Sequence, residues 1–318
     1  MHDIVIRSGK VVDGTGKAIQ QMDIAIDNGL ITAVGNDIGE GRTEIDASNH
    51  LVTPGFVDVH THYDGQATWD PEMSPSSYHG VTTTVFGNCG VGFAPAQPDS
   101  HDWLIQLMEG VEDIPGAALA EGIEWNWETF PEYLDALEKM PRVMDIATQV
   151  PHGSVRAYVM GERGARNEDP TAKDLIAMAQ IVQEGIEAGA LGFTSSRTML
   201  HRALDGEPVP GTFAGAEELI AMGKAVADAG GGVVEVASDI GLGGLEGNFG
   251  SDIDWMRALA NDYGLTVTYA LNQADRHPQQ WRELLELSSA PIDGDGKVIA
   301  QVAGRPAGLL FGLETSLH

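Results

Sequence analysis

The chain has 318 residues, of which 42% are hydrophobic and 20% charged, so it can bury a sizeable core and is not expected to be disordered as a whole. Its formal net charge of -29 would repel phosphate backbones, so we do not expect nucleic acid as a partner. No run approaches the roughly 18 consecutive apolar residues of a membrane helix, so we do not expect a membrane as a partner either. The first residues lack the basic-then-apolar pattern of a signal peptide, and we expect a cytoplasmic protein.

Residues 1–54 are predicted to form a small β domain. Short alternating apolar runs, broken by glycine and asparagine, are typical of β-hairpins. The three predicted hairpins have the sequences IVIRSGKVVDG, MDIAIDNGLITAVG and TEIDASNHLVTPG. The strongest turn signal among them is Asn28-Gly29, because both residues tolerate the left-handed backbone that a two-residue hairpin turn needs.

From residue 55 to residue 318 the pattern changes to repeated β-then-α units. Short apolar runs predict strands over 56–60, 81–86, 143–149, 190–194, 232–237, 265–271 and 298–302. Amphipathic segments predict helices over 171–188, 215–229, 251–263 and 278–288, the first of them capped by Thr171. Such units favour a parallel sheet, as a TIM barrel or a doubly wound sheet. The insertion 95–142 is interpreted as a lid or surface excursion.

The segment PGFVDVHTHYDGQATWDP, which begins at Pro54, contains the strongest candidate for a metal site. Side chains alternate along a strand, so Asp58, His60 and His62 are expected on one face at the end of the first barrel strand. Neutral imidazole is a common zinc ligand, and catalytic groups gather at the carboxyl ends of barrel strands. We therefore predict that His60 and His62 bind a divalent metal.

Cys89 is the only cysteine of the chain and cannot form an internal disulfide. It follows the next predicted strand in the segment GVTTTVFGNCGVGFAP, at the same end as the two histidines. A thiolate there can ligate or bridge metals, and the neighbouring glycines permit tight turns. We therefore predict Cys89 as the third ligand, the alternative being a buried free cysteine.

The β-rich start, PGFVDVHTH, GVTT and GNCG together resemble the amidohydrolase superfamily, and within it the D-aminoacylase (N-acyl-D-amino-acid deacylase) group. The resemblance implies an α/β fold, a TIM barrel with a small β-sandwich domain to which residues 1–54 contribute. It also implies that a metal, usually zinc, is held partly by cysteine and that an amide bond of an N-acyl-D-amino acid is hydrolysed by a metal-activated water. The partner is then a small acylated amino acid or related amide, and a homo-oligomer is left open.

The chain departs from that group in two places. The resemblance implies histidine ligands at the ends of strands five and six, but GGVVEVASDIG contains none, and LTVTYALNQADRH carries Asn272 and Gln273 there. Glu235 could offer an oxygen instead. The implied general-base aspartate is expected beyond residue 318, since the chain has seven predicted strands where a barrel needs eight. We interpret the chain as a fragment that lacks the last βα unit and is expected to lack full activity alone.

Three further residues are predicted to contact substrate. Recognition of a substrate carboxylate needs a cation, and Arg197, after strand four, offers a guanidinium that pairs with carboxylate through two hydrogen bonds. His201 lies nearby, and His152 follows strand three. Two alternatives remain: a hydrolase of cyclic amides, like hydantoinase or dihydroorotase, and a catalytically idle scaffold of the same fold, which the absent histidines favour.

Overall fold

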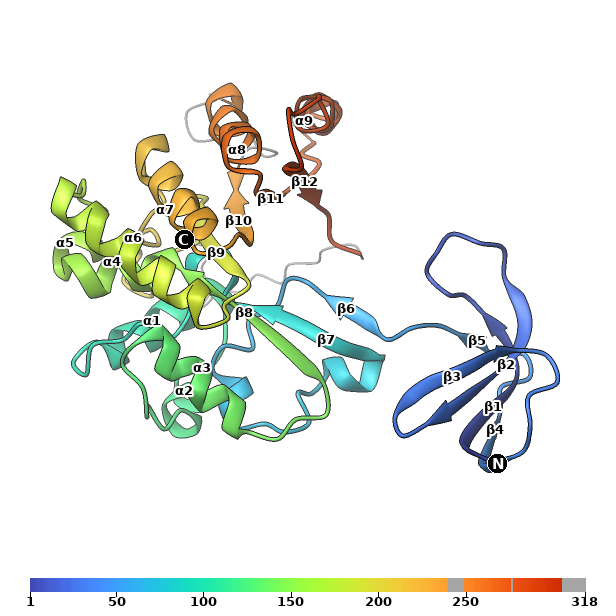
Figure 1. The fold of residues 1–318 in the computed structure, drawn as a ribbon. Helices are drawn as coiled ribbons and strands as arrows, with labels where there is room; N and C mark the ends of the chain where they lie inside the picture. Colours follow the sequence, from blue (N-terminus) through green and yellow to red (C-terminus); the bar gives the residue numbers. More distant parts are fainter. Residues whose placement is uncertain (240–248, 276, 305–318) are drawn as a thin grey trace. The chain divides into compact units, whose positions relative to one another are not determined.

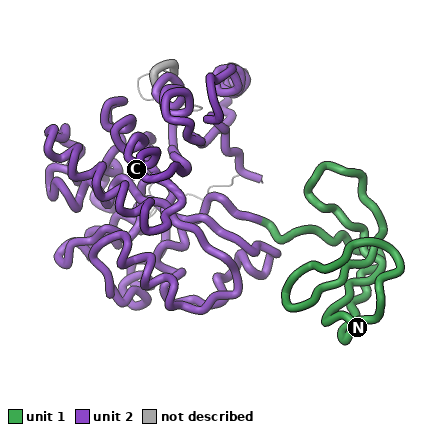
Figure 2. Tube along the Cα trace, viewed as in Figure 1, with its two compact units in different colours: residues 1–56 green, residues 57–318 purple. Residues whose placement is uncertain are grey.

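The computed structural model describes residues 1–239, 249–275 and 277–304. It divides into two compact units, Met1–Phe56 and Val57–His318 (Figure 2). Within the described ranges, no helix is long and apolar enough to serve as a membrane span.

The first unit is a five-stranded sheet with the order β3-β2-β1-β4, in which β5 also pairs with β1. Asn28 and Gly29 have φ values of 53° and 77°, as the tight turn between β2 and β3 requires, and the predicted hairpin over these strands is confirmed. The strands are β1 (His2–Val11), β2 (Gln20–Asp27), β3 (Leu30–Gly35), β4 (Gly41–Asp46) and β5 (Leu51–Val52).

The other two predicted hairpins are wrong. Ser8 has φ 57°, but the chain continues as one strand, and the register of β1 against β2 shifts between Ile6 and Gly9. The Ser8-Gly9 signal therefore marks a bulge and not a reversal. Strands β4 and β5 do not pair with each other, because both run parallel to β1 and occupy successive parts of its edge.

The second unit is built on a seven-stranded sheet with the order β12-β11-β10-β9-β8-β7-β6 (Figure 1). Every pairing from β7 to β12 is parallel, and the predicted seven strands are each found within three residues of their expected bounds. The sheet is consistent with an incomplete TIM barrel. The strands are β6 (Phe56–Asp58), β7 (Val81–Phe86), β8 (Asp145–Pro151), β9 (Gly192–Arg197), β10 (Val233–Ser238), β11 (Thr266–Ala270) and β12 (Lys297–Gln301).

The four predicted helices are found within two residues of their expected bounds, as α6, α7, α8 and α9, whereas α4 and α5 were not predicted. Helix α6 begins after Thr171, whose hydroxyl accepts the Asp174 amide while the Asp174 carboxylate accepts the Thr171 amide, so the predicted cap is confirmed. The helices of this part are α4 (His152–Met160), α5 (Glu162–Ala165), α6 (Ala172–Glu187), α7 (Ala216–Asp228), α8 (Phe249–Tyr263) and α9 (Gln280–Ser288).

The insertion 95–142 is part of the core and not a surface excursion. It forms α1 (His101–Glu112), α2 (Gly116–Gly122) and α3 (Phe130–Lys139). The side chains of Trp127, Phe130 and Tyr133 are buried in the main apolar cluster, as are four residues of α1. These aromatic residues bury the insertion, since large rings gain most from leaving water. Short 3-10 turns complete the fold at η1 (Gln66–Thr68), η2 (Ser76–His79) and η3 (Asn88–Gly90).

Candidate metal centre

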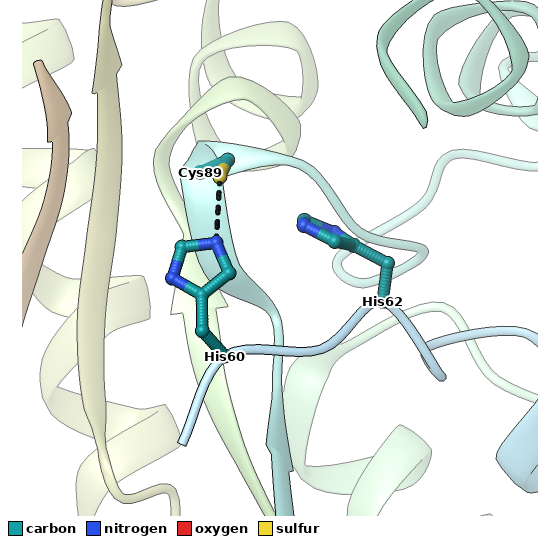
Figure 3. Close-up of side chains that lie close together, drawn as sticks. All are labelled: His60, His62 and Cys89. Carbon is teal, nitrogen blue, oxygen red and sulfur yellow. Dashed lines mark hydrogen bonds between the residues drawn. The ribbon is translucent and has the colours of Figure 1, made fainter. Parts of the chain in front are cut away.

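His60 and His62 lie just past the carboxyl end of β6. The strand ends at Asp58, two residues earlier than expected, so the histidines belong to the segment that follows it. The Thr61 amide and hydroxyl between them both donate to the Val85 carbonyl, at 3.0 and 2.7 Å. This anchor to β7 lets both imidazoles approach Cys89 (Figure 3).

Cys89 lies in a tight left-handed turn after β7. Gly87, Cys89 and Gly90 have φ values of 78°, 57° and 70°, a conformation that glycine adopts without the cost a side chain brings. The buried Asn88 side chain donates to the carbonyls of Thr61 and Val85, at 3.1 and 3.0 Å. The turn therefore holds the sulfur on a rigid loop, against the segment that carries the histidines.

Buried polar residues of the neighbouring strands support this turn. Gln149 Nε2 of β8 donates to the side-chain oxygen Oδ1 of Asn88 at 2.9 Å, and the Gly90 amide donates to the Thr194 hydroxyl of β9 at 3.1 Å. The Cys89 amide donates to a carboxylate oxygen of Glu235, on β10, at 3.0 Å. Parallel strands bring these residues together although they are far apart in the sequence.

Gly87→Ala is predicted to cost about 2–4 kcal/mol of the free energy of unfolding, because a left-handed alanine is strained and its Cβ has no room. That Cβ would lie 2.3 Å from the Gln149 carbonyl oxygen, a backbone atom that cannot move aside. Gly264→Ala is the matched control, since Gly264 has φ +69° and nothing within 4 Å of its Cβ position. Urea unfolding of both variants tests this, and equal losses would contradict it.

The donor atoms of His60, His62 and Cys89 all lie within 4.8 Å of one another. His60 Nε2 is 3.1 Å from the Cys89 sulfur (Figure 3). His60 Nδ1 is 3.0 Å from Gln301 Oε1, an atom that can only accept, and Gln301 Nε2 is fixed by donation to Thr268 at 3.0 Å. This contact favours the tautomer of His60 with the proton on Nδ1, in which the Nε2 lone pair faces the sulfur.

Glu112 and His201 lie in the same cluster. With Cys89 they form a second group whose donor atoms are all within 4.8 Å of one another, and Glu112 Oε1 is 3.2 Å from His62 Nε2. His201 was expected beside the substrate, and the structure places it next to the predicted metal ligands. Glu112 was missed from the sequence, although one signal was present: it continues the buried stripe of Leu104 and Met108 on α1.

Burial disfavours the charged forms of these residues. It lowers the pKa of His62 to about 3, with a smaller contribution from His60, and raises the pKa of Glu235 to about 7. Burial, followed by the carboxylate of Glu235, also raises the pKa of the Cys89 thiol. His62 is therefore a neutral imidazole, the form that ligates metals.

Arg197 and His152 have protein partners of their own. Arg197 Nε donates to Asp252 at 3.0 Å, and a second guanidinium nitrogen donates to the Ala214 carbonyl. His152 is fully buried, with Nδ1 2.9 Å from the Ser195 hydroxyl and Nε2 3.0 Å from Glu218. Neither belongs to the cluster around Cys89. Their contact with substrate stays a prediction, and the contacts of His152 favour a structural role.

The chain is similar in sequence to curated deacylases. The chain is 32% identical over 197 residues to the D-aminoacylase of Alcaligenes xylosoxydans xylosoxydans, an alignment that covers 61% of this chain and 37% of that protein. It is 31% identical over 194 residues to the N-acyl-D-aspartate deacylase of the same organism, with 61% and 36% covered. The chain thus spans about a third of the length of these curated relatives.

A solved structure of D-aminoacylase, reported for the functional role of its binuclear metal center, is 26% identical and superimposes with a TM-score of 0.75, over 95% of this chain and 58% of that one. The model of the amidohydrolase family matches residues 43–311, which is most of the sequence. The match includes both histidines, Cys89, Glu112 and His201, and the chain belongs to the amidohydrolase family.

Proposed function

We propose that the protein is a metal-dependent hydrolase that cleaves the amide bond of N-acyl-D-amino acids. One observation carries the proposal: the donor atoms of His60, His62 and Cys89 converge within 4.8 Å at the carboxyl ends of β6 and β7. Catalytic groups of barrel enzymes gather at this end. Family membership and the deacylase relatives supply the reaction class and the substrate class.

The residues fit a divalent metal, for which zinc is the proposed ion. Zinc binds imidazole nitrogen at about 2.0–2.1 Å and thiolate sulfur at about 2.3 Å, so two ligand atoms in a tetrahedral site lie about 3.5 Å apart. The 3.1 Å between His60 Nε2 and the Cys89 sulfur is close to that spacing. His62 Nδ1 and Glu235 Oε1 are in addition buried without a hydrogen-bond partner. Buried polar atoms of this kind are commonly satisfied by an ion or water.

A zinc ion at this site would polarise the scissile carbonyl and lower the pKa of water toward about 7. The chain's own residues orient the ligands for this. Gln301 accepts from His60 Nδ1 and so favours the tautomer with a free Nε2. The Glu235 carboxylate accepts from the backbone amide of Cys89 and so fixes the position of that residue. Loss of a residue that orients a metal ligand commonly lowers metal affinity or activity by about 10–100-fold.

Arg197 is the proposed partner of the substrate carboxylate, since a guanidinium recognises a carboxylate through paired hydrogen bonds. Its side chain is 15% exposed and lies at the end of β9, the strand that precedes His201. Asp252 orients it through Nε at 3.0 Å, which leaves further guanidinium donors for a ligand.

Hydrolysis of N-acyl-D-amino acids by the full-length protein tests the proposal. We expect release of free D-amino acid from N-acetyl-D-amino acids and little release of amino acid from the L enantiomers. Chelation of the metal should abolish this hydrolysis, and added Zn²⁺ should restore it. The proposal fails if a folded, metal-loaded protein leaves the D substrates intact. Equal release from both enantiomers would keep the hydrolase and reject the stereochemical assignment.

A further inference from the structure

We infer that Asp239 is a positioning residue for the substrate, which acts by fixing the start of the loop that connects β9 to α7. The inference rests on the proposed function in one respect, that Arg197 and His201 line the site at which an N-acyl-D-amino acid binds. It assigns a role to a carboxylate that follows β10 and that belongs neither to the groups of converging donors nor to the predicted substrate contacts.

The backbone pairing of β9 with β10 ends where this loop begins. The two strands lie side by side (Figure 1), and Arg197 lies opposite Ser238 in the last pair of their register. Asp239 is the next residue beyond that pair. The first amides of the loop therefore need acceptors other than the neighbouring strand, because a backbone amide that is withdrawn from water without a partner is costly.

The Asp239 carboxylate supplies these acceptors. One of its oxygens accepts from the Met199 amide at 2.8 Å, and the other accepts from the hydroxyl of the buried Thr198. The Thr198 hydroxyl in turn accepts from the Leu200 amide at 3.1 Å. A single carboxylate thus holds three consecutive residues, directly or through Thr198. Its own two hydrogen bonds are charge-assisted and hence stronger than neutral ones.

The three residues lie between the two that are proposed to line the site. Arg197, the proposed partner of the substrate carboxylate, precedes them as the last residue of β9. His201 follows them, and one of its ring nitrogens lies within 4.8 Å of donor atoms of Cys89 and Glu112. A displaced segment 198–200 would therefore move His201 and release the end of β9 that carries Arg197.

The loop continues as a short hairpin that is tied to the same residues. Arg202 pairs with Pro208 across the hairpin, and its guanidinium donates to the Met199 carbonyl at 3.2 Å. Met199 is thus held at its amide by Asp239 and at its carbonyl by Arg202, so a displaced Met199 would move the hairpin with it. A misplacement of about 1 Å can cost about 100-fold in rate even when the substitution lies far from the reacting atoms.

Steady-state kinetics of the Zn²⁺-loaded full-length protein test the inference, with the N-acetyl-D-amino acid that the parent hydrolyses fastest. We expect Asp239→Ala to raise KM by about 10–100-fold with a much smaller change in kcat, because misplaced binding groups weaken ground state and transition state alike. Bound zinc should stay as in the parent. Asp239→Asn should restore most of the parent KM, since its amide oxygen can accept from Met199 while its nitrogen donates to Thr198.

Thr198→Val removes the hydroxyl through which Asp239 holds part of the loop. It should also raise KM, and Thr198→Val/Asp239→Ala should raise KM by much less than the product of the two single effects, because substitutions that break one shared contact do not add. Thermal unfolding verifies that each variant folds, and Thr198→Val takes the place of Asp239→Ala if that variant does not.

Asp70→Ala is the matched control. Asp70 is half-buried like Asp239 and also accepts from two backbone amides, but it lies near the amino end of the sheet, where the Pro71 carbonyl accepts from the Val143 amide just before β8. Asp70→Ala should lose stability and keep its KM.

Three results in Asp239→Ala would overturn the inference and leave the proposed function standing. They are a KM that moves no more than in Asp70→Ala, a fall in kcat without a change in KM, and a loss of bound zinc. A parent that does not hydrolyse N-acetyl-D-amino acids overturns the inference and the proposed function together.

Discussion

Cys89→Ala is expected to lower the hydrolytic rate of the full-length protein by about 10³-fold or more. A metal supplies several kcal/mol of transition-state stabilisation, and each 1.36 kcal/mol changes a rate tenfold. Cys89 is the one residue common to both groups of converging donors, so its loss weakens every metal position of the cluster. Rates of N-acyl-D-amino-acid hydrolysis and metal content, measured on the same preparation, test this.

Val91→Ala is the control for this substitution. Val91 is fully buried two residues away and offers no metal ligand, so its truncation removes packing in the same region. We expect Val91→Ala to lose stability while keeping its metal and most of its activity. A Cys89→Ala protein that keeps its metal and its rate would show that the sulfur is only a buried apolar group.

Glu218→Ala is expected to lower the free energy of unfolding by about 3–5 kcal/mol, the usual cost of breaking a buried ion pair from one side. Arg156 is 2% exposed, and its guanidinium donates to Glu218 Oε1, which also contacts His152 Nε2 at 3.0 Å. Burial alone would raise the pKa of Glu218, but His152 and Arg156 outweigh it and hold that pKa below its ordinary value.

Removal of this carboxylate leaves a buried guanidinium without a counter-charge, which is why the cost exceeds that of an ordinary truncation. Glu217→Ala is the control, because Glu217 is the exposed neighbour on the same helix and should cost well under 1 kcal/mol. Urea unfolding measures both. If both variants lose the same small amount of the free energy of unfolding, the Arg156 guanidinium must be hydrated or paired with another group in Glu218→Ala, which would contradict the prediction.

The sequence predicted the second unit better than the first. Strands of a parallel sheet are short apolar runs separated by long amphipathic helices, and that contrast is visible locally, as for 81–86 and β7. In the first unit, the pairing partner of each strand decides the topology. The signals at Ser8-Gly9 and around His50 resemble turns, yet β1 continues through the first and receives β4 and β5 in parallel. Local patterns do not encode such pairings.

The candidate site was predictable where its residues follow strands directly. His60, His62 and Cys89 come at the ends of β6 and β7, so chain order alone brings them to one edge of the sheet. Glu112 lies 50 positions after His62, on a helix within an insertion, and only tertiary packing brings it back. Glu112 lies on the buried stripe of α1, and a carboxylate on a buried face needs a polar partner. This position is therefore the one local signal of the contact with His62.

His152 shows where prediction from strand position fails. It follows β8 at the carboxyl end of the sheet, which favoured a role in the site, but helix α4 begins at this residue and its ring packs against Phe193. Both ring nitrogens then have protein partners. Position along a strand predicts the edge on which a residue lies, whereas the direction of its side chain depends on the elements packed around it.

Elemental analysis of the purified protein, beside a His60→Ala/His62→Ala/Cys89→Ala variant, tests the central claim most directly. We predict zinc or another divalent metal at one or more equivalents per chain in the parent, and its loss in the triple variant with the fold retained. A parent that folds and binds no metal, or a triple variant that binds as much as the parent, would contradict the assignment of this cluster as a metal centre.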